Sequence, residues 1–221
     1  MEREGLIALG ISESPILEAY RNVRSIIRAA GDNLKTIEIT GVVPDTEKSV
    51  FTANLAVVMA QSGKKILLMD CDSVNPAQHA LFQLENRGLS EAAVSGNDIH
   101  AFCQATRQTG LDLLAAGSGV LSDLLSSERF PQLLDGVKAS YDYILLDAPA
   151  VLASADASAL AACADGVVLV VESGKEEPKT VQLAKKRLEQ AKAKILGCVL
   201  NNMKVDRRYD EFFRMQGGVE Q

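Results

Sequence analysis

A lysine followed by a serine stands at the end of the segment Val42 to Ser49, where an apolar stretch gives way to a helical pattern. In phosphate-binding loops, backbone N–H groups and a helix N-terminus surround the phosphates, a lysine reaches the terminal phosphates, and a serine hydroxyl binds Mg²⁺. Lys48 and Ser49 have these two positions. The usual pattern places glycine first and sixth in this window, where the chain has Val42 and Glu47. The segment predicts a phosphate-binding loop with an altered backbone.

Three acidic residues stand at the ends of two later apolar stretches. Asp70 and Asp72 belong to LLMDCDSVNP, and Asp147 belongs to YDYILLDAPA. Because ligands of open α/β sheets bind at the carboxyl ends of the strands, we expect the three carboxylates to meet beside Lys48 where Mg²⁺ would sit. Asp70 and Asp72 would share one face of their strand, with Cys71 on the other. Each acid alone is weak evidence, because such residues also cap helices and turns, but this order is more specific.

Short apolar runs alternate with helical patterns and must position these residues. The runs are continuous, as in strands buried on both faces of a parallel sheet. The predicted strands are Thr36–Gly41, Lys65–Cys71, Leu111–Ala115, Asp142–Ala148, Gly166–Val171 and Ile195–Leu200. The predicted helices are Ser14–Ala30, with Ser14 as N-cap and Pro15 at the first position, and Lys48–Gln61, Phe130–Ser140, Ala155–Ala164 and Glu177–Ala191.

The alternation of strands and helices predicts an α/β fold with a doubly wound, mostly parallel sheet of the P-loop NTPase type. No linker rich in proline, serine or glycine divides the chain, so we expect a single domain over residues 1–204. From Val205 the strand pattern is lost, which predicts a mobile C-terminal tail over residues 205–221.

Composition excludes several classes of function. The chain has 221 residues, 47% of them apolar, and a net charge of −6, which disfavours binding to nucleic acid or to an anionic membrane. No apolar run is long enough to span a bilayer, so we expect a soluble protein without a membrane span. The four cysteines form no CxxC pair and have only two histidines beside them, which indicates reduced, mostly buried thiols and no zinc site.

The order of motifs resembles the cytoplasmic domain of the bacterial tyrosine kinases that govern capsule and exopolysaccharide synthesis. The resemblance extends from about Glu13 to Met203. It rests on the segments SPILEAYRNVR, VPDTEKS, NLAVVMAQSGKKILLMDCD, NPAQHALF, GLSEAAVSG, AAGSG with LLSSERFPQLL, YDYILLDAPA, SADASALAACADGVVLVV and ILGCVLNNM.

The resemblance assigns a role to each residue of the predicted site and implies Mg-ATP or Mg-ADP as cofactor. Lys48 would contact the phosphates, and Asp72 would be the base for a tyrosine hydroxyl. Ser49, Asp70 and Asp147 would serve the metal, with Asp147 as the acid of the third motif. Asn201 or Asn202 would read the base of the nucleotide, and the resemblance leaves open which of the two does so.

Three charged residues near the N-terminus, Glu18, Arg21 and Arg24, resemble the ExxRxxR oligomerisation motif of the same family. Residues three apart on a helix stay within an arc of roughly 120°, so the three groups can face one neighbouring subunit. A solvated charged face is the alternative. With the resemblance, we expect a homo-oligomer.

The chain departs from the family at the phosphate-binding loop. Where the family has PGEGKS, this chain has PDTEKS, so Asp45 and Glu47 replace two glycines. Backbone strain and repulsion of phosphate charge predict poor or absent ATP binding. Two hypotheses remain for Glu47: the substitution is tolerated and the site binds Mg-nucleotide weakly, or the acid folds onto Lys48 and the loop N–H groups and occupies the phosphate site.

Two further departures concern the acceptor and a lost cation. Asp72 is followed by Ser73-Val74-Asn75-Pro76, where the family carries one or two arginines. The tail holds a single tyrosine, Tyr209, where the family carries a cluster for phosphorylation between subunits.

These features favour a regulatory or scaffolding member of the family with impaired kinase activity. It would be cytoplasmic and recruited to the inner face of the cell membrane by a membrane-embedded polysaccharide chain-length or export adaptor. The first alternative is an active, ATP-dependent tyrosine autokinase with a tolerant loop. The second is a positioning ATPase of the ParA/MinD type, which shares the LLMDCD strand but carries a further lysine where this chain has Val42-Val43.

Overall fold

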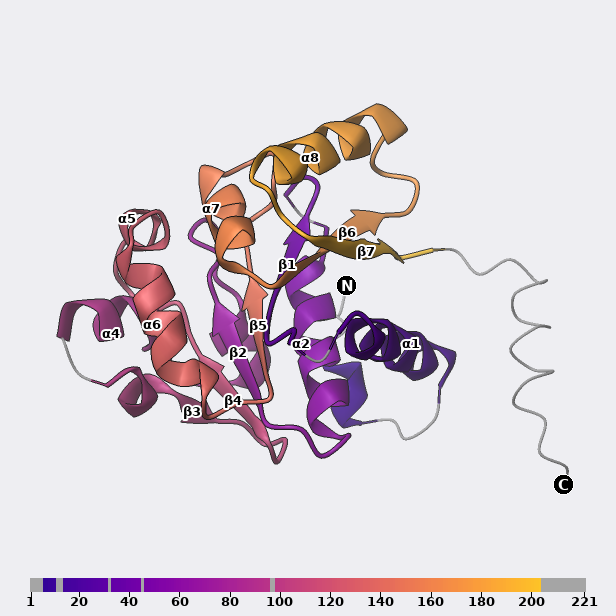
Figure 1. The fold of residues 1–221 in the computed structure, drawn as a ribbon. Coiled ribbons are helices and arrows are strands. Elements are labelled where there is room, and N and C mark those ends of the chain that lie inside the picture. The colour runs from indigo at the N-terminus through magenta and orange to yellow at the C-terminus, as the bar shows by residue number, and fades with distance from the viewer. Residues whose placement is uncertain (1–5, 11–13, 32, 45, 96–97, 204–221) are drawn as a thin grey trace, which may run out of the picture.

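A computed structural model describes residues 6–10, 14–31, 33–44, 46–95 and 98–203. Among these residues, seven strands form one sheet in the order β3-β4-β2-β5-β1-β6-β7, in which only the pair β3 and β4 is antiparallel (Figure 1). The strands are β1 (Thr36–Gly41), β2 (Ile66–Asp70), β3 (Gln104–Ala105), β4 (Leu111–Leu114), β5 (Tyr143–Asp147), β6 (Gly166–Glu172) and β7 (Ile195–Asn201). The predicted fold class, a single α/β unit with a mostly parallel sheet, is confirmed over these residues.

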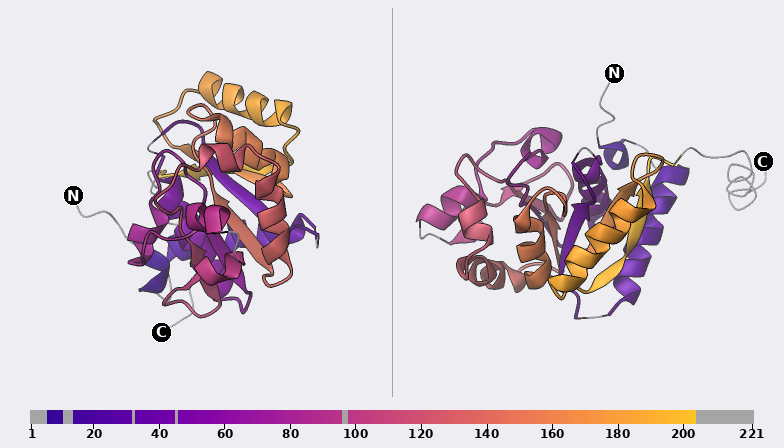
Figure 2. Two further views of the ribbon diagram at one scale, coloured as in Figure 1. Left: turned by 90° about the vertical axis from the view of Figure 1, so that its left-hand side faces the viewer. Right: turned by 90° about the horizontal axis from the view of Figure 1, so that it is seen from above.

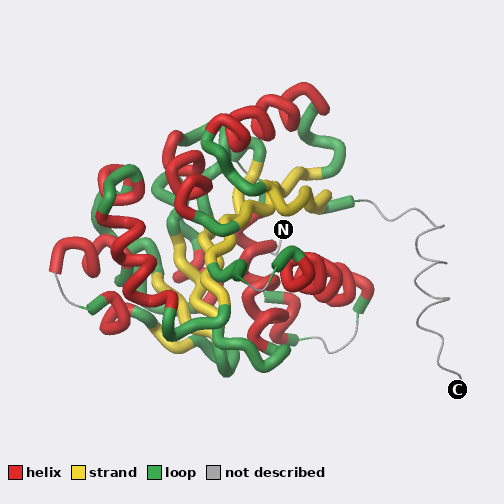
Figure 3. Tube along the Cα trace, in the orientation of Figure 1, coloured by secondary structure: helices red, strands yellow, loops and turns green. Residues whose placement is uncertain are grey.

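Helices cover both faces of the sheet (Figures 1 and 2). Apolar side chains of α1 and α2 pack on one face, and those of α4, α6, α7 and α8 pack on the other. The helices are η1 (Ile7–Leu9), α1 (Pro15–Ala29), α2 (Lys48–Ala60), α3 (Gln78–Phe82), α4 (Leu89–Ser95), η2 (Ile99–Phe102), α5 (Ser122–Leu125), α6 (Arg129–Lys138), α7 (Ala155–Cys163) and α8 (Pro178–Gln190). The strands therefore lie between two helical layers (Figure 3).

All of the predicted strands and helices are present, with ends shifted by at most one or two residues. At the start of α1, the Ser14 side chain accepts a hydrogen bond from the Leu17 N–H and Pro15 has the first helical position, as predicted. The cysteine prediction is wrong in part: all four thiols are free, but only Cys71 is fully buried and Cys198 is exposed. Cys198 lies on β7, an edge strand with one exposed side.

The strand order brings the predicted site residues together. β5 lies between β2 and β1, and the three strands are parallel, so their carboxyl ends meet at one edge of the sheet. Asp70 on β2 is in register with Asp147 on β5. None of the described helices is long and apolar enough to cross a membrane.

Candidate functional site

The predicted phosphate-binding loop joins β1 to α2 and closes tightly on itself. A Cβ atom at Gly41 would collide with the Thr46 side chain, so the end of β1 requires glycine. Thr40 Oγ1 donates to the Pro149 carbonyl at 2.7 Å and ties this end of β1 to the segment after β5. The loop therefore delivers Lys48 to the first position of α2, directly above the carboxyl ends of the central strands.

Lys48 is buried and lies among the predicted acids. Its Nζ is 2.6 Å from Asp72 Oδ2 and 3.2 Å from Asp147 Oδ1. It also donates to Ser49 Oγ at 3.1 Å. Burial opposes the charge on Lys48, but the neighbouring Asp147 and Asp72 raise its pKa above the usual value. The structure thus places four of the predicted site residues in one charged cluster.

Asp70 has a different environment from the other two acids. Its Oδ1 accepts from the Asp72 N–H at 3.3 Å, and its Oδ2 accepts from the N–H groups of Ala77 at 3.0 Å and Gln78 at 2.9 Å. Burial and the adjacent Asp147 carboxylate raise the Asp70 pKa to about 8. Cys71 packs in the core on the opposite face of the sheet, as the alternation along β2 predicts. Asp70 thus anchors the start of α3 beneath the cluster.

Asp72 and Asp156 hold the loop that follows β2. Asp72 Oδ1 accepts from the N–H groups of Val74 at 3.0 Å and Asn75 at 2.9 Å. Asp156, buried at the start of α7, accepts from the hydroxyls of Ser73 at 2.5 Å and Ser122 at 2.9 Å. Sequence reasoning missed Asp156 because its partners lie in loops distant along the chain.

Gln78 is a second buried residue of the site that sequence reasoning missed. Its Nε2 donates to Asp147 Oδ2 at 2.7 Å and to the Ser49 carbonyl at 2.9 Å. It is fully buried at the first position of α3. No motif marks a glutamine at the start of a five-residue helix, so its role emerges only from the packing of α3 on α2.

Glu47 adopts the left-handed backbone conformation that favours glycine, with φ 50° and ψ 22°. Its carboxylate is exposed and accepts a hydrogen bond from Asn202 Nδ2 at 3.1 Å. Lys48 bonds instead to the aspartates, so the hypothesis that Glu47 folds onto Lys48 is wrong. Asp45 lies outside the described residues.

Both predicted asparagines lie beside the loop, at the end of β7. Asn201 Nδ2 is 3.5 Å from the Thr46 carbonyl, and Asn202 pairs with Glu47. On the other side, Tyr20 of α1 stacks on Phe51 of α2, with ring centroids 5.3 Å apart. Burial and the nearby Glu47 carboxylate raise the Tyr20 pKa to about 12. The loop therefore contacts the end of β7 on one side and lies close enough to α1 on the other for Glu47 to affect Tyr20.

The three residues of the predicted oligomerisation motif have different surroundings on α1. Glu18 and Arg21 form an ion pair of 3.2 Å near the surface. Arg24 donates from Nη1 to the Val58 carbonyl of α2 at 3.0 Å. Arg24 is thus already engaged within the fold, whereas Glu18 is exposed on the surface of α1.

The donors at the site fit magnesium better than zinc. A hydroxyl from Ser49 and carboxylates from Asp70 and Asp147 are oxygen ligands, which Mg²⁺ prefers. No cluster of three histidine, cysteine or acidic side chains in the described part of the chain is arranged to hold a metal ion. Mg²⁺ is commonly held by one or two carboxylates, water and substrate phosphates, so the residues present fit a magnesium–nucleotide complex.

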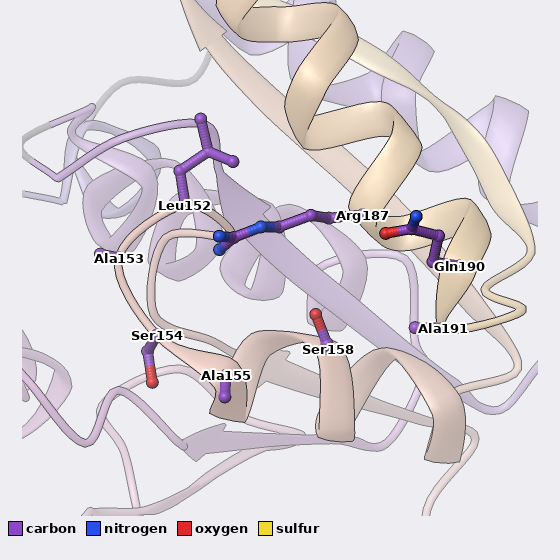
Figure 4. A pocket seen from close by; sticks show the side chains of 8 residues that line it. All are labelled: Leu152, Ala153, Ser154, Ala155, Ser158, Arg187, Gln190 and Ala191. Carbon is purple, nitrogen blue, oxygen red and sulfur yellow. The ribbon is translucent and has the colours of Figure 1, made fainter.

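A shallow pocket of about 660 Å³ lies between α7 and α8, apart from these acids (Figure 4). Its lining residues are Leu152, Ala153, Ser154, Ala155, Ser158, Arg187, Gln190 and Ala191. Arg187 extends from α8 toward the segment before α7 and donates to the Val151 carbonyl at 3.1 Å. The arginine therefore fastens α8 to this segment.

The sheet order and the two helical layers define a fold of the P-loop NTPase type. Residues 35–193 match the family described as "AAA domain". The MinD septum site-determining protein of Pyrococcus horikoshii, solved with Mg-ADP, aligns with a TM-score of 0.65 at 23% identity, over 79% of this chain and 72% of that one. At that identity the likeness concerns the fold.

Within this class, the comparisons identify the family. The chain is 38% identical to the tyrosine-protein kinase YwqD of Bacillus subtilis over 210 residues. This alignment covers 93% of this chain and 89% of YwqD. The solved chimerical protein CapA2B2 aligns with a TM-score of 0.86 at 34% identity, over 93% of this chain and 92% of that one. The chain belongs to the bacterial tyrosine-kinase family.

Proposed function

We propose that this protein is a regulatory tyrosine-kinase-like subunit of a capsule or exopolysaccharide system that binds Mg-nucleotide weakly and has reduced phosphotransfer activity. The observation that carries the proposal is the contact of Lys48 Nζ with both Asp72 and Asp147, since it preserves the charged centre that phosphate binding needs. Glu47 explains the reduction, because it adds a carboxylate at the start of α2.

The geometry supports a role for each residue of the cluster. Lys48 would move from its acid partners to the terminal phosphates, since phosphate oxygens offer it equivalent charge. Ser49, Asp70 and Asp147 would hold Mg²⁺, which neutralises charge on the phosphates. Asp72 would accept the proton of a tyrosine hydroxyl while the tyrosine oxygen bonds to the terminal phosphorus of ATP. ADP would leave with the electrons of the broken P–O bond. Asn201 or Asn202 would contact the base.

Partners follow from the family and from the surface of α1. We propose a homo-oligomer in which the exposed Glu18 contributes to the contact, together with Arg21 and Arg24. A membrane-embedded chain-length or export adaptor would recruit this cytoplasmic protein to the inner face of the membrane. Tyr209, the single tyrosine after β7, lies outside the described residues.

An active tyrosine autokinase is the second candidate function. It is favoured by the direction of the Glu47 side chain, which bonds to Asn202 and leaves Lys48 to its aspartates. Since the loop has the backbone conformation that glycine would take, the substitution alters charge more than shape. A positioning ATPase of the MinD type has support from the fold alone.

Calorimetry with Mg-ADP and transfer of labelled phosphate from Mg-ATP to tyrosine test the proposal together. We expect weak binding and slow transfer, both lost in Lys48→Met. Affinity and transfer typical of a working kinase would favour the second candidate. ATP hydrolysis without any phosphotyrosine would favour the MinD type, and the absence of nucleotide binding at any concentration would refute all three.

A further inference from the structure

Gln78 has a buried oxygen that no group in the described part of the structure satisfies. Its Nε2 has two acceptors, Asp147 Oδ2 and the Ser49 carbonyl, but its Oε1 has no hydrogen-bond partner. Two acceptors on one side fix the orientation of the amide, because reversing it would set oxygen against oxygen. The unpaired atom is therefore the oxygen.

The position of this oxygen relates it to the metal site. In an amide, oxygen and nitrogen are about 2.3 Å apart, so Oε1 lies within about 5 Å of Asp147 Oδ2 and of the Ser49 carbonyl. Ser49 and Asp147 are two of the groups that fit Mg²⁺. An acceptor on the amide that already binds Asp147 Oδ2 suits a hydrogen bond from a water molecule held by the ion.

An unpaired buried acceptor destabilises a fold, so such a group in a site calls for a ligand. A hydrated cation supplies one, because each coordinated water has hydrogens to donate. Mg²⁺ in particular keeps several waters when it binds to proteins. Gln78 also joins two elements of the site, since its amide links the Asp147 carboxylate at the end of β5 to the start of α2.

We propose that Gln78 is a positioning residue of the metal site: its amide nitrogen orients Asp147 against Ser49, and its free oxygen accepts a hydrogen bond from water on the bound divalent cation. The inference rests on the proposed function, because it needs a metal–nucleotide complex at this site. It predicts that Gln78 determines how strongly Mg²⁺ enhances nucleotide binding.

The test measures the Kd of ADP by calorimetry, once with Mg²⁺ and once with EDTA. The Kd in EDTA divided by the Kd in Mg²⁺ gives the effect of the metal. Gln78→Met keeps the length of the side chain and removes both hydrogen-bonding functions. We expect it to reduce this ratio about tenfold or more, in line with the loss of other outer-shell partners of metals, while the Kd in EDTA stays close to that of the wild type.

Gln104→Met is the matched control. Gln104 also donates from Nε2 to two carbonyls, those of Glu85 and Arg87, but it lies beside β4 away from the acids. It should leave the metal ratio unchanged. Gln78→Glu keeps an oxygen acceptor but sets a second oxygen against Asp147 Oδ2 and the Ser49 carbonyl, so we expect it to reduce the metal effect as Gln78→Met does. It also serves if Gln78→Met fails to fold.

The outcomes separate the inference from the function on which it rests. If the wild type responds to Mg²⁺ and Gln78→Met responds equally, Gln78 has no role toward the metal and the proposed function stands. A metal effect in Gln78→Glu equal to that of the wild type would overturn the assignment of Nε2 as the group that orients Asp147. If the wild type shows no Mg-ADP binding, the proposed function fails, and the inference fails with it.

Discussion

Glu47 allows the charge of the loop to be separated from its backbone conformation. Glu47→Gln removes the charge and keeps a side chain that can still pair with Asn202. Glu47→Gly removes the charge and also the strain of a left-handed, non-glycine residue at φ 50°. The strain is present with or without nucleotide, so its relief should change the stability of the fold, whereas loss of the charge should change affinity.

The expected magnitudes follow from the exposure of the carboxylate. One carboxylate about 4 Å from a phosphate charge opposes binding by about 1 kcal/mol in water and about 4 kcal/mol at an effective dielectric constant of about 20. An intermediate value of about 2 kcal/mol corresponds to roughly thirtyfold in Kd. For stability, Glu47→Gly relieves about 1–2 kcal/mol of strain but loses about 0.5–1 kcal/mol to the flexibility of glycine, which leaves a gain of at most about 1.5 kcal/mol.

Calorimetry with Mg-ADP and urea unfolding measure these two effects. Both variants should bind ADP roughly thirtyfold more tightly than the wild type, with the difference narrowing as salt screens the charge. Glu189→Gln, which removes an exposed charge on α8, is the control and should bind like the wild type. If Glu47→Gly gains affinity and Glu47→Gln does not, backbone geometry limits binding and the electrostatic reasoning is refuted.

Substitutions at Glu38, Arg24 and Glu18 test a buried carboxylate, an internal hydrogen bond and a surface charge. Glu38 is fully buried on β1 and neither carboxylate oxygen has a hydrogen-bond partner among the described residues, so Glu38→Leu should raise the free energy of unfolding by about 1–3 kcal/mol, with Glu38→Gln showing no such gain. Burial raises the Glu38 pKa, so the folded wild type holds a proton that the unfolded chain releases. The stability advantage of Glu38→Leu in urea unfolding should therefore grow as the pH rises above about 4.3, the pKa of glutamate in an unfolded chain. An advantage that does not change with pH would contradict this account. Arg24→Ala should lower the free energy of unfolding by about 1.5–3 kcal/mol, because it loses the hydrogen bond to the Val58 carbonyl. Equal melting temperatures for the wild type and Arg24→Ala would show that this bond contributes nothing to stability. Glu18→Ala should weaken only self-association, measured by analytical ultracentrifugation.

Most of the fold could be predicted because its strands are buried on both faces. Continuous apolar runs such as those of β2, β5 and β6 are typical of strands buried on both faces, and their alternation with helices indicates the fold class. The short elements α3, α4, α5 and β3 were not predicted. They span two to seven residues, which is too short for a hydrophobic period to show, and they depend on contacts such as that of the Asp70 carboxylate with the start of α3.

The charged residues of the candidate site could be predicted from the sequence, but the hydrogen bonds that join them to the rest of the fold could not. Lysine and the acids are marked by their position after strands, and parallel pairing brings them together. Gln78 and Asp156 act through partners remote in sequence, such as Asp147 and Ser122, which no local pattern reveals. The same holds for Glu47. Its backbone conformation follows from the loop pattern, but the direction of its side chain depends on Asn202, which lies 155 residues later.

The contact between Glu47 and Asn202 also bears on which asparagine would read the base. Asn202 donates to a carboxylate at 3.1 Å, whereas Asn201 has a longer contact of 3.5 Å with a neutral carbonyl. Bonds to charged groups are the stronger ones, so Asn201 can be drawn to a ligand more easily. Asn201→Ala should then weaken Mg-ADP binding in the wild type, and Asn202→Ala should weaken it only after Glu47→Ala has released the amide. A double-mutant cycle on ADP affinity measures this coupling. Equal losses from Asn202→Ala with and without Glu47 would show that the contact does not restrain Asn202.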